Sequence, residues 1–394
     1  MQPYSRRPRS YQAGFTLVEL MVGLTIGMFA ALIIVQVISV FEAQRRSTTG
    51  TADAQTNGGI ALYTIAHELQ MAGYPLVPVN NSPLFCTGLT INGTADATTP
   101  NRLSPVAITD SVVGTGANAS ASDAITIRYG DSLMGGTAAQ ITAGLAGTVV
   151  PVSSNFGCVV NDISLIYNGL NCSMSKVTAV AGTPPAATTV QLADVTGAAV
   201  NSNLACVGTW HEVTYRVNAG NLERCDLAIA APAGGNCNPS LFPSTPNPYF
   251  VTSVVGIVNL QAQYGVTAAA NSTPPTPINV IQWVDPSGAT WGAPTVANRN
   301  RIKAIRIAVV AQNAKMEPSA VTSACSSTTA AQPTGLCAWD ATSALPTPLV
   351  APFVASPAPT IDLSASNSQW LQYRYRVFDT IIPLRNVIWA NGTL

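Results

Sequence analysis

The residues whose types and spacing suggest chemistry lie at the start of the chain. Gly14 is followed directly by Phe15, and one carboxylate, Glu19, stands four residues further on inside a long apolar stretch. A charge near the centre of a bilayer costs about 2.5 kcal/mol or more on insertion scales, so Glu19 needs a partner. Cutting the chain after Gly14 would create one, the α-amino group of Phe15. In a stack of like helices, the amine of a neighbour could pair with Glu19 and drive axial docking.

The segment that carries these residues has the composition of a membrane helix. From Phe15 to Phe41 the only charged residue is Glu19, and the one other strongly polar side chain is Gln36. Roughly 20 apolar residues span a bilayer, and the arginines of the leader, residues 1–14, would stay cytoplasmic. A secretory signal is cut after its apolar segment, whereas here the small residue precedes it, so we expect residues 15–41 to be retained. An ordinary membrane anchor with a tolerated Glu is the alternative.

The helical pattern continues past the membrane segment through residues 42–74. Its apolar positions follow the i, i+3, i+4, i+7 spacing of an amphipathic helix, and Gly73 and Pro75 then end it. These positions are Leu62, Ile65, Ala66, Leu69 and Ala72. We expect one helix over residues 15–72, about 85 Å long at 1.5 Å per residue, whose second half packs on a sheet. Gly23 and Gly27 form a GxxxG that permits close helix approach, although small residues of a crowded helix bundle are the favoured explanation.

Residues 75–394 have the pattern of a β-rich head domain. Strands are predicted at 124–129, 162–167, 212–217, 256–264, 301–310 and 372–378. Segments rich in Ala, Thr, Pro and Asn at 176–202, 227–250, 266–280 and 316–368 are predicted to be loops, and no internal repeat is evident. The predicted fold class is therefore α+β, a long N-terminal helix packed on an antiparallel sheet with long loops.

The cysteine pattern indicates an exported domain. All eight cysteines follow the apolar segment, and an even number in an exported domain predicts disulfides. They are Cys86, Cys158, Cys172, Cys206, Cys225, Cys237, Cys325 and Cys337. Cys325 and Cys337 bracket a short polar loop and are the favoured pair, while the rest of the connectivity stays open. Without a CxxC motif, and with two histidines in the chain, we expect no metal site and no cofactor.

Composition argues against enzymes and nucleic-acid binders. The formal net charge is zero, and without the leader arginines 15 basic residues face 18 acidic ones, so we expect no nucleic-acid partner. The basic cluster of Arg299, Arg301, Lys303, Arg306, Arg374 and Arg376 is better explained as a solvated strand face. His211 and Glu212 are strand neighbours that point to opposite faces, and no nucleophile motif accompanies them. His67 is assigned a surface or sheet-packing role, and no catalytic residue is predicted.

The segment Gly14-Phe15-Thr16-Leu17-Val18-Glu19 closely resembles the processing motif of the type IV pilin superfamily. That motif has Gly, then Phe or Met, and Glu at the fifth mature position. The resemblance implies cleavage after Gly14 and N-methylation of Phe15 by a membrane prepilin peptidase. It also implies assembly into a filament through the N-terminal helix, with Glu19 as the docking residue.

Later segments resemble PilW-type minor pilins, with divergent loops between them. The similar segments are His67 to Tyr74, Tyr215 to Arg224, Val254 to Val266, Ile302 to Val310 and Tyr375 to Asn386. In one place the chain departs from the family. Members often carry an acidic stretch after Tyr-Gly-Val, whereas residues 267–273 hold no carboxylate, which makes Ca²⁺ coordination there doubtful. Arg385-Asn386 is expected either to pin the last strand or to contact a neighbouring subunit.

The resemblance implies a structural role. A minor pilin would sit in the inner membrane with its head in the periplasm, surrounded by lipid, and then move into a surface pilus. Its partners would be the prepilin peptidase, other minor pilins, the major pilin and the inner-membrane assembly platform, in a low-copy complex that starts assembly at the tip. A type II secretion pseudopilin and a displayed DNA-uptake or adhesion module are the alternatives.

Overall fold

The structure is a computed structural model. It describes residues 14–76, 86–97, 102–113, 121–169, 171–183, 186–228, 237–239, 249–268, 279–326, 333–339 and 361–389. The leader arginines and much of the predicted loops 227–250, 266–280 and 316–368 lie outside these ranges. The chain divides into two compact units, Met1–Ala52 and Asp53–Leu394, and each is described by itself.

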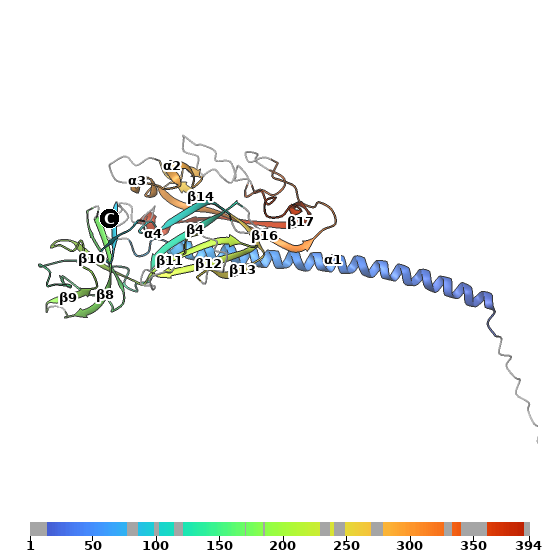
Figure 1. Ribbon diagram of the computed structural model, residues 1–394, viewed down its shortest axis with the longest axis horizontal. Helices are drawn as coiled ribbons and strands as arrows, with labels where there is room; N and C mark the ends of the chain where they lie inside the picture. The colour runs from blue at the N-terminus through green and yellow to red at the C-terminus, as the bar shows by residue number, and fades with distance from the viewer. Residues whose placement is uncertain are drawn as a thin grey trace, which may run out of the picture. The chain divides into compact units, whose positions relative to one another are not determined.

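One long helix, α1 (Leu17–Met71), forms the N-terminal element, as the sequence predicts (Figure 1). In the second unit Ile65, Leu69 and Ala72 are fully buried, while Leu62 and Ala66 are partly buried against the same core. Three small residues extend that buried face toward the N-terminus of the unit, at Ala54, Gly58 and Ala61. This spacing continues the apolar stripe of an amphipathic helix.

Gly58 marks the closest approach between α1 and the sheet. A Cβ added at Gly58 would lie 2.2 Å from the ring of Phe378, so glycine lets the helix backbone pack against that ring. Glycine in a helix interior costs about 1 kcal/mol relative to alanine. Here this cost is offset by packing that a larger residue would disturb.

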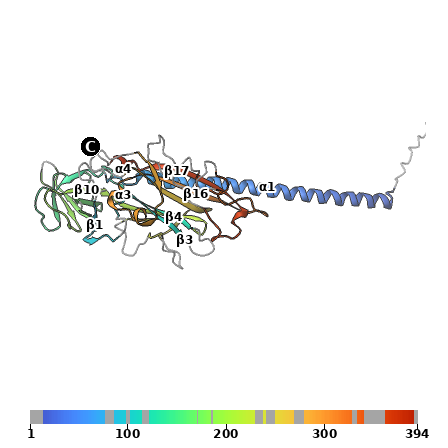
Figure 2. The ribbon, with the colours of Figure 1, turned by 90° about the horizontal axis from the view of Figure 1, so that it is seen from above.

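The described residues of the head form three sheets (Figures 1 and 2). The five-stranded sheet has the order β13-β12-β11-β4-β3, formed by β3 (Val106–Val113), β4 (Ala121–Gly130), β11 (Trp210–Asn218), β12 (Asn221–Ala228) and β13 (Val251–Val255). The four-stranded sheet has the order β15-β14-β16-β17, formed by β14 (Ile257–Val266), β15 (Gln282–Val284), β16 (Ile302–Met316) and β17 (Tyr373–Pro383). Both sheets are antiparallel throughout, and both contribute to the core that covers α1.

The remaining strands form the third sheet. They are β1 (Gly88–Ile91), β2 (Thr94–Ala95), β5 (Ala138–Gln140), β6 (Val149–Val152), β7 (Ile163–Asn168), β8 (Asn171–Ala181), β9 (Thr188–Leu192) and β10 (Asn203–Gly208). β1 and β8 run parallel, an exception within the antiparallel head that the sequence predicts. Short helical segments complete the described head: α2 (Gly288–Trp291), α3 (Val296–Arg299), η3 (Trp370–Gln372) and α4 (Arg385–Trp389).

All six predicted strands are present, as β4, β7, β11, β14, β16 and β17. The turn between β11 and β12 has positive φ angles at Ala219 (48°) and Gly220 (74°), as tight hairpins require. The predicted loop at 176–202 is wrong, because it contains the end of β8 and all of β9. Its Ala- and Thr-rich composition is typical of a loop. The strands form there because they pair with neighbouring strands.

Residues 131–209, between β4 and β11, fold into a closed β-barrel. Hydrogen bonding follows the order β5-β10-β7-β8-β9-β6, and a bridge from Ile141 to Val152 returns to the end of β5. The barrel has a core of its own, with Ile166, Val177 and Leu204 among its buried members. It lies at the C-terminal end of α1, where the Tyr74 hydroxyl donates to the carbonyl of Ser132 at 2.7 Å (Figure 1).

The barrel contains an internal repeat, contrary to the expectation from the sequence. The loops after β6 and β9 share one conformation, with positive φ at Gly157 and Gly197 (82° and 81°) and at Asn161 and Asn201 (80° and 68°). Their hydrogen bonds also match. Asn161 donates to Val177 and Asn201 donates to Ile141 through backbone N–H groups, each at 2.9 Å. The only sequence signal is Gly-x-x-Val-Asn, which occurs twice.

Side chains of β4, rather than a backbone ladder, join the five-stranded sheet to β14. Ser122 Oγ accepts the N–H of Leu260 at 2.9 Å, and Asp123 Oδ2 accepts the N–H of Ala262 at 2.7 Å. The other oxygen of Asp123 accepts the N–H of Ser111 at 3.1 Å, in a bulge of β3. Burial raises the pKa of Asp123 to about 7, although these hydrogen bonds act to lower it.

A second core covers the other face of the four-stranded sheet. It gathers Trp283, Trp339 and Trp370 around Ala308 and Val310 of β16. β16 is therefore buried on both faces over most of its length. This explains why its sequence is a continuous apolar run interrupted by cations rather than a clean alternation.

Four disulfides staple the head, and all eight cysteines take part. The structure joins Cys325 to Cys337, the pair that the spacing favours. The other pairs are Cys86–Cys172, Cys158–Cys206 and Cys225–Cys237. Cys86–Cys172 connects the segment after α1 to β8 of the barrel, and Cys158–Cys206 closes the first repeat loop onto β10.

Helix α1 ends against the last described residues of the chain. The amide nitrogen of Asn386 donates to the carbonyl oxygens of Gln70, Met71 and Ala72, at 3.3, 3.3 and 3.2 Å. Helix ends leave such carbonyls without partners inside the helix. Asn386 thus caps the C-terminus of the helix. This contact gives a defined partner to the residue that the sequence predicts to pin the last strand. Gly73, with φ of 78°, turns the chain and donates its N–H to Arg128.

Replacing Asn386 with alanine should destabilise the head by about 1–3 kcal/mol, because it removes the side-chain donor from the half-buried carbonyl of Ala72 and weakens the cap over Gln70 and Met71. The measurement is the urea midpoint of the detergent-solubilised chain, followed by tryptophan fluorescence. Arg385→Ala, at the exposed neighbouring position, should change stability by no more than about 0.5 kcal/mol. Equal effects of the two substitutions would contradict the capping role.

Asp123 should make the head less stable as pH rises. The folded chain keeps this proton up to about pH 7, whereas the usual pKa is 3.8, so the folded state binds more protons between these values. The free energy of unfolding should fall by about 1.4 kcal/mol per pH unit there, and this contribution should be level above about pH 7. Asp123→Asn should remove that part of the slope in urea titrations. Parallel curves for the two proteins would contradict it.

Candidate functional site

The candidate site begins where α1 begins. Gly14 lies three residues before the helix, and a Cβ added there would meet no atom within 4 Å. Phe15 follows with 88% of its surface exposed. The bond between these two residues is therefore free of neighbouring side chains within the described part of the chain. The leader residues 1–13 lie outside the described ranges.

Thr16 and Glu19 form a reciprocal cap on the first turn of α1. The backbone N–H of Thr16 donates to Glu19 Oε2 at 3.0 Å, and the N–H of Glu19 donates to Thr16 Oγ1 at 3.3 Å. The hydroxyl of Thr16 also donates to the same carboxylate oxygen at 3.0 Å. This is a capping box, which the spacing Thr16-x-x-Glu19 would have predicted. Thr16 is thus a partner of Glu19 in addition to the amine that the sequence predicts.

The capping box leaves half of the carboxylate available. All of these hydrogen bonds go to Oε2, and Oε1 has none from any residue that the structure describes. A carboxylate at a helix N-terminus is also favoured by the helix dipole. Glu19 is therefore held in position by its own helix, with one oxygen free for a second donor.

The first unit presents apolar side chains on all sides of the helix. Phe29 is 70% exposed and Ile33 is 60% exposed, and the other large apolar residues up to Phe41 are similar. α1 is the one helix in the described chain that is long and apolar enough to cross a membrane, judged by length and composition. Gly23 and Gly27 have no atom within 4 Å of an added Cβ, so their surface is open to a partner helix.

The predicted solvated face of basic residues is wrong, because three of its members are buried. Arg299, Lys303 and Arg306 are 5%, 1% and 0% exposed. Arg306 of β16 is covered by Trp339 of the second core, whereas Arg299 lies in α3 and is buried beside Cys86. Arg374 and Arg376 of β17 are exposed, but the group as a whole makes no cationic surface for nucleic acid.

Each buried cation either contacts a nearby group that stabilises its charge or has a pKa that burial lowers. The guanidinium of Arg299 donates to the carbonyl of Cys86 at 2.6 Å, and burial lowers the pKa of Arg299 to about 10. Arg306 stacks 4.1 Å from the ring centre of Trp339 and lies 3.8 Å from Asp379. Burial lowers the pKa of Lys303 to about 8. Of these groups, Arg306 links β16 to Trp339 of the second core.

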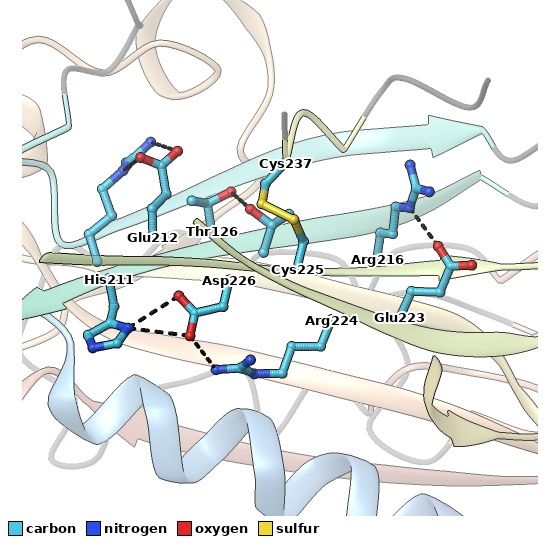
Figure 3. The surroundings of a disulfide bond; sticks show 11 residues. Thr126, His211, Glu212, Arg216, Glu223, Arg224, Cys225, Asp226 and Cys237 are labelled. Carbon is cyan, nitrogen blue, oxygen red and sulfur yellow. Dashed lines mark hydrogen bonds and ion pairs between the residues drawn. A yellow bond between two sulfur atoms is a disulfide. The ribbon is translucent and has the colours of Figure 1, made fainter. Parts of the chain in front are cut away.

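His211 and Glu212 belong to two separate ion-pair groups and not to one catalytic pair (Figure 3). His211 Nδ1 lies 3.2 Å from Asp226, and its ring stacks on Tyr129. Glu212 instead faces Arg128, at 3.4 Å. The hydrogen bond with Asp226 raises the pKa of His211.

The His211 group extends to helix α1 through Arg224. Its guanidinium lies 3.1 Å from Asp226 and 2.9 Å from Glu68 of the helix. Figure 3 shows Arg224 reaching across from β12 toward the helix. The group therefore ties β11 and β12 to α1. His67, the neighbour of Glu68, is exposed, and its ring lies 6.1 Å from that of Tyr63 on the helix surface.

The described residues hold no group of three or more His, Cys, Asp or Glu side chains that could bind a metal. The segment after Tyr-Gly-Val is described only as far as Ala268, so the expected lack of a Ca²⁺ site at 267–273 lies largely outside the described ranges. The geometry that remains is structural: an accessible Gly14–Phe15 bond, a capped carboxylate and an apolar helix that continues into a disulfide-stapled head.

Comparisons with known proteins agree with this geometry. Residues 9–35 match the family model described as the prokaryotic N-terminal methylation motif. Residues 248–386 match the model described as type IV pilus-assembly protein W, which spans β13 to β17 and ends on Asn386. No match was found among curated proteins.

A search of solved structures matched a type IV-like pilin from Thermus thermophilus. That match is 12% identical and covers 84% of this chain and 96% of that one, with a TM-score of 0.31. So loose a superposition carries no argument about function.

Replacing Thr16 with valine should loosen the first turn of α1, because it removes the hydroxyl of the capping box. Loss of such a cap weakens a helix by about 1 kcal/mol, which corresponds to roughly five-fold faster exchange of the amide of Glu19. The measurement is amide hydrogen exchange of the unprocessed chain in micelles. Thr16→Ser keeps the hydroxyl and should exchange as the original chain does. Equal exchange in the two variants would rule out the cap.

Proposed function

We infer that this chain, which matches the N-terminal methylation motif over residues 9–35 and the pilus-assembly family W over residues 248–386, is a PilW-type minor pilin that helps to initiate assembly of a type IV pilus. It acts within a low-copy complex of minor pilins at the pilus tip. The observation that carries the proposal is the arrangement of Gly14, Phe15, Thr16 and Glu19 at the start of an apolar helix that continues into the head.

Processing follows from the accessible bond at the start of this helix. A prepilin peptidase cuts after Gly14 and methylates the new amine of Phe15, and the apolar helix stays with the head. Before assembly, residues 15–41 lie in the inner membrane with the head in the periplasm. After assembly, the same segment lies among other pilin helices.

Docking follows from the capped carboxylate. Thr16 holds Glu19 through Oε2, and the amine of an adjacent pilin pairs with Oε1 as the two helices slide together. In surroundings without water this charge pair is far stronger than at a surface. It also removes the cost of leaving the carboxylate alone in an apolar setting. The next subunit can therefore stack on this one, so this chain starts a filament without ending it.

The size of the head supports a low-copy role. The barrel of residues 131–209 and the second core over β16 enlarge the head beyond the two sheets that cover α1. A subunit of this bulk suits the tip or a priming complex better than the repeating body of a pilus. The match to the pilus-assembly family W over residues 248–386 favours a pilus over a secretion pseudopilus.

Removing the charge of Glu19 should block incorporation into pili. Glu19→Gln keeps an acceptor for the capping box but cannot form the charge pair, so the chain should be cleaved after Gly14 yet fall at least ten-fold in sheared pili. The measurement is mass spectrometry of sheared pili and membranes, which also reports methylation of Phe15. Thr16→Val, which loses the cap and keeps the charge, should still be incorporated.

Two outcomes would contradict the proposal. Incorporation of Glu19→Gln at the original level would rule out docking by a charge pair. Cells that lack this chain should lose surface pili and twitching. If they keep both and lose protein secretion instead, the chain is a type II secretion pseudopilin.

A further inference from the structure

We propose that two loops of the barrel form a docking surface for a protein partner that presents apolar side chains bordered by lysine or arginine. The surface consists of Leu133, Met134, Phe156 and Val159, and is called the barrel patch below. It is separate from the residues that process or dock α1. The proposal therefore stands or falls independently of the proposed pilus role.

The barrel patch is apolar and open to solvent. Leu133 is 95% exposed, Phe156 66%, Val159 63% and Met134 46%. The two loops that carry these side chains touch each other, since a Cβ added at Gly157 would lie 2.8 Å from Cβ of Met134. Large apolar side chains gathered on one exposed surface mark interaction sites in soluble domains.

The internal repeat shows that the fold does not need these side chains. The loop after β9 adopts the same conformation as the loop after β6, with matching positive φ angles and matching backbone hydrogen bonds. At the positions equivalent to Phe156 and Val159 it carries Thr196 and Ala199. Because a small or polar residue supports the same turn, Phe156 and Val159 are present for another reason. Contact with a partner provides one.

The charges of the barrel indicate the chemistry of that partner. Residues 131–209 contain four charged side chains, Asp131, Asp162, Lys176 and Asp194. Two of the acids border the barrel patch: Asp131 is two residues from Leu133 and its side chain is 53% exposed, and Asp162 accepts the N–H of Val159 at 2.9 Å. An acidic border disfavours anionic lipid and polyanions. It complements a protein surface with basic residues around an apolar centre.

In-cell photo-crosslinking tests the surface directly. A benzoylphenylalanine placed at Phe156 of the full chain should form an adduct with one protein species, and one placed at the equivalent Thr196 should form none. Mass spectrometry of the adduct should locate the crosslink on an apolar surface that lysine or arginine borders. An adduct with a second copy of this chain, an adduct with lipid, equal adducts at both sites, or no adduct would each overturn the proposal.

Binding measurements on the protein identified by the crosslink complete the test. The full chain with Phe156→Thr and Val159→Ala, the residues that the second repeat uses, should bind it at least ten-fold more weakly. Val200→Ala, at an exposed position of the second loop, should bind unchanged. Formation of the Cys158–Cys206 disulfide reports that the barrel is folded.

If the double variant does not form that disulfide, Leu133→Ser takes its place, because a side chain that is 95% exposed contributes little to folding. Unchanged binding by either folded variant would overturn the proposal.

Discussion

The structure depends on ending one long helix inside the head. The last carbonyls of α1 need donors, and the side chain of Asn386 supplies them from a point more than 300 residues further along the chain. The same turn of the chain passes the N–H of Gly73 to Arg128 of β4. The end of α1, the first element of the head, is therefore capped by a residue of α4, the last described element. Such a long-range closure makes folding dependent on the complete chain and slows it.

Polar side chains connect elements of the head that no backbone hydrogen-bond ladder connects. Ser122 and Asp123 accept backbone N–H groups from the edge of β14 that faces β4. Arg224 of β12 forms ion pairs with Asp226 of the same strand and with Glu68 of α1. Arg306 lies beneath Trp339 of the second core, and Lys303 is buried in the same strand. Charged residues make up only 9% of the chain, and several of them are used inside. The surface is left to neutral polar residues, as its composition suggests.

Local patterns made the helix and six strands predictable. The apolar run from Phe15 to Phe41, the i, i+3, i+4 spacing around Ile65 and the stop at Gly73 are all short-range signals. The barrel was missed because β9 is short and rich in Thr and Val within a stretch that resembles a loop. The capping box at Thr16 is also a short-range signal, since Thr16-x-x-Glu19 has the spacing of that motif. The partner of Asn386 and the burial of Arg299 and Lys303 depend on contacts that no local pattern encodes.

The barrel enters and leaves the head at a single point. Gly130 ends β4 and Trp210 begins β11, and these two residues pair directly in the five-stranded sheet. Topologically, β4 and β11 are a hairpin whose turn has been replaced by residues 131–209. A short turn at this point would preserve the pairing of β4 with β11, and would remove the Cys86–Cys172 bridge, the pairing of β1 with β8, the Tyr74–Ser132 hydrogen bond and the barrel side chains that belong to the main core. The family match at 248–386 lies entirely outside this segment, so the barrel is an insertion between two paired strands that this match does not include.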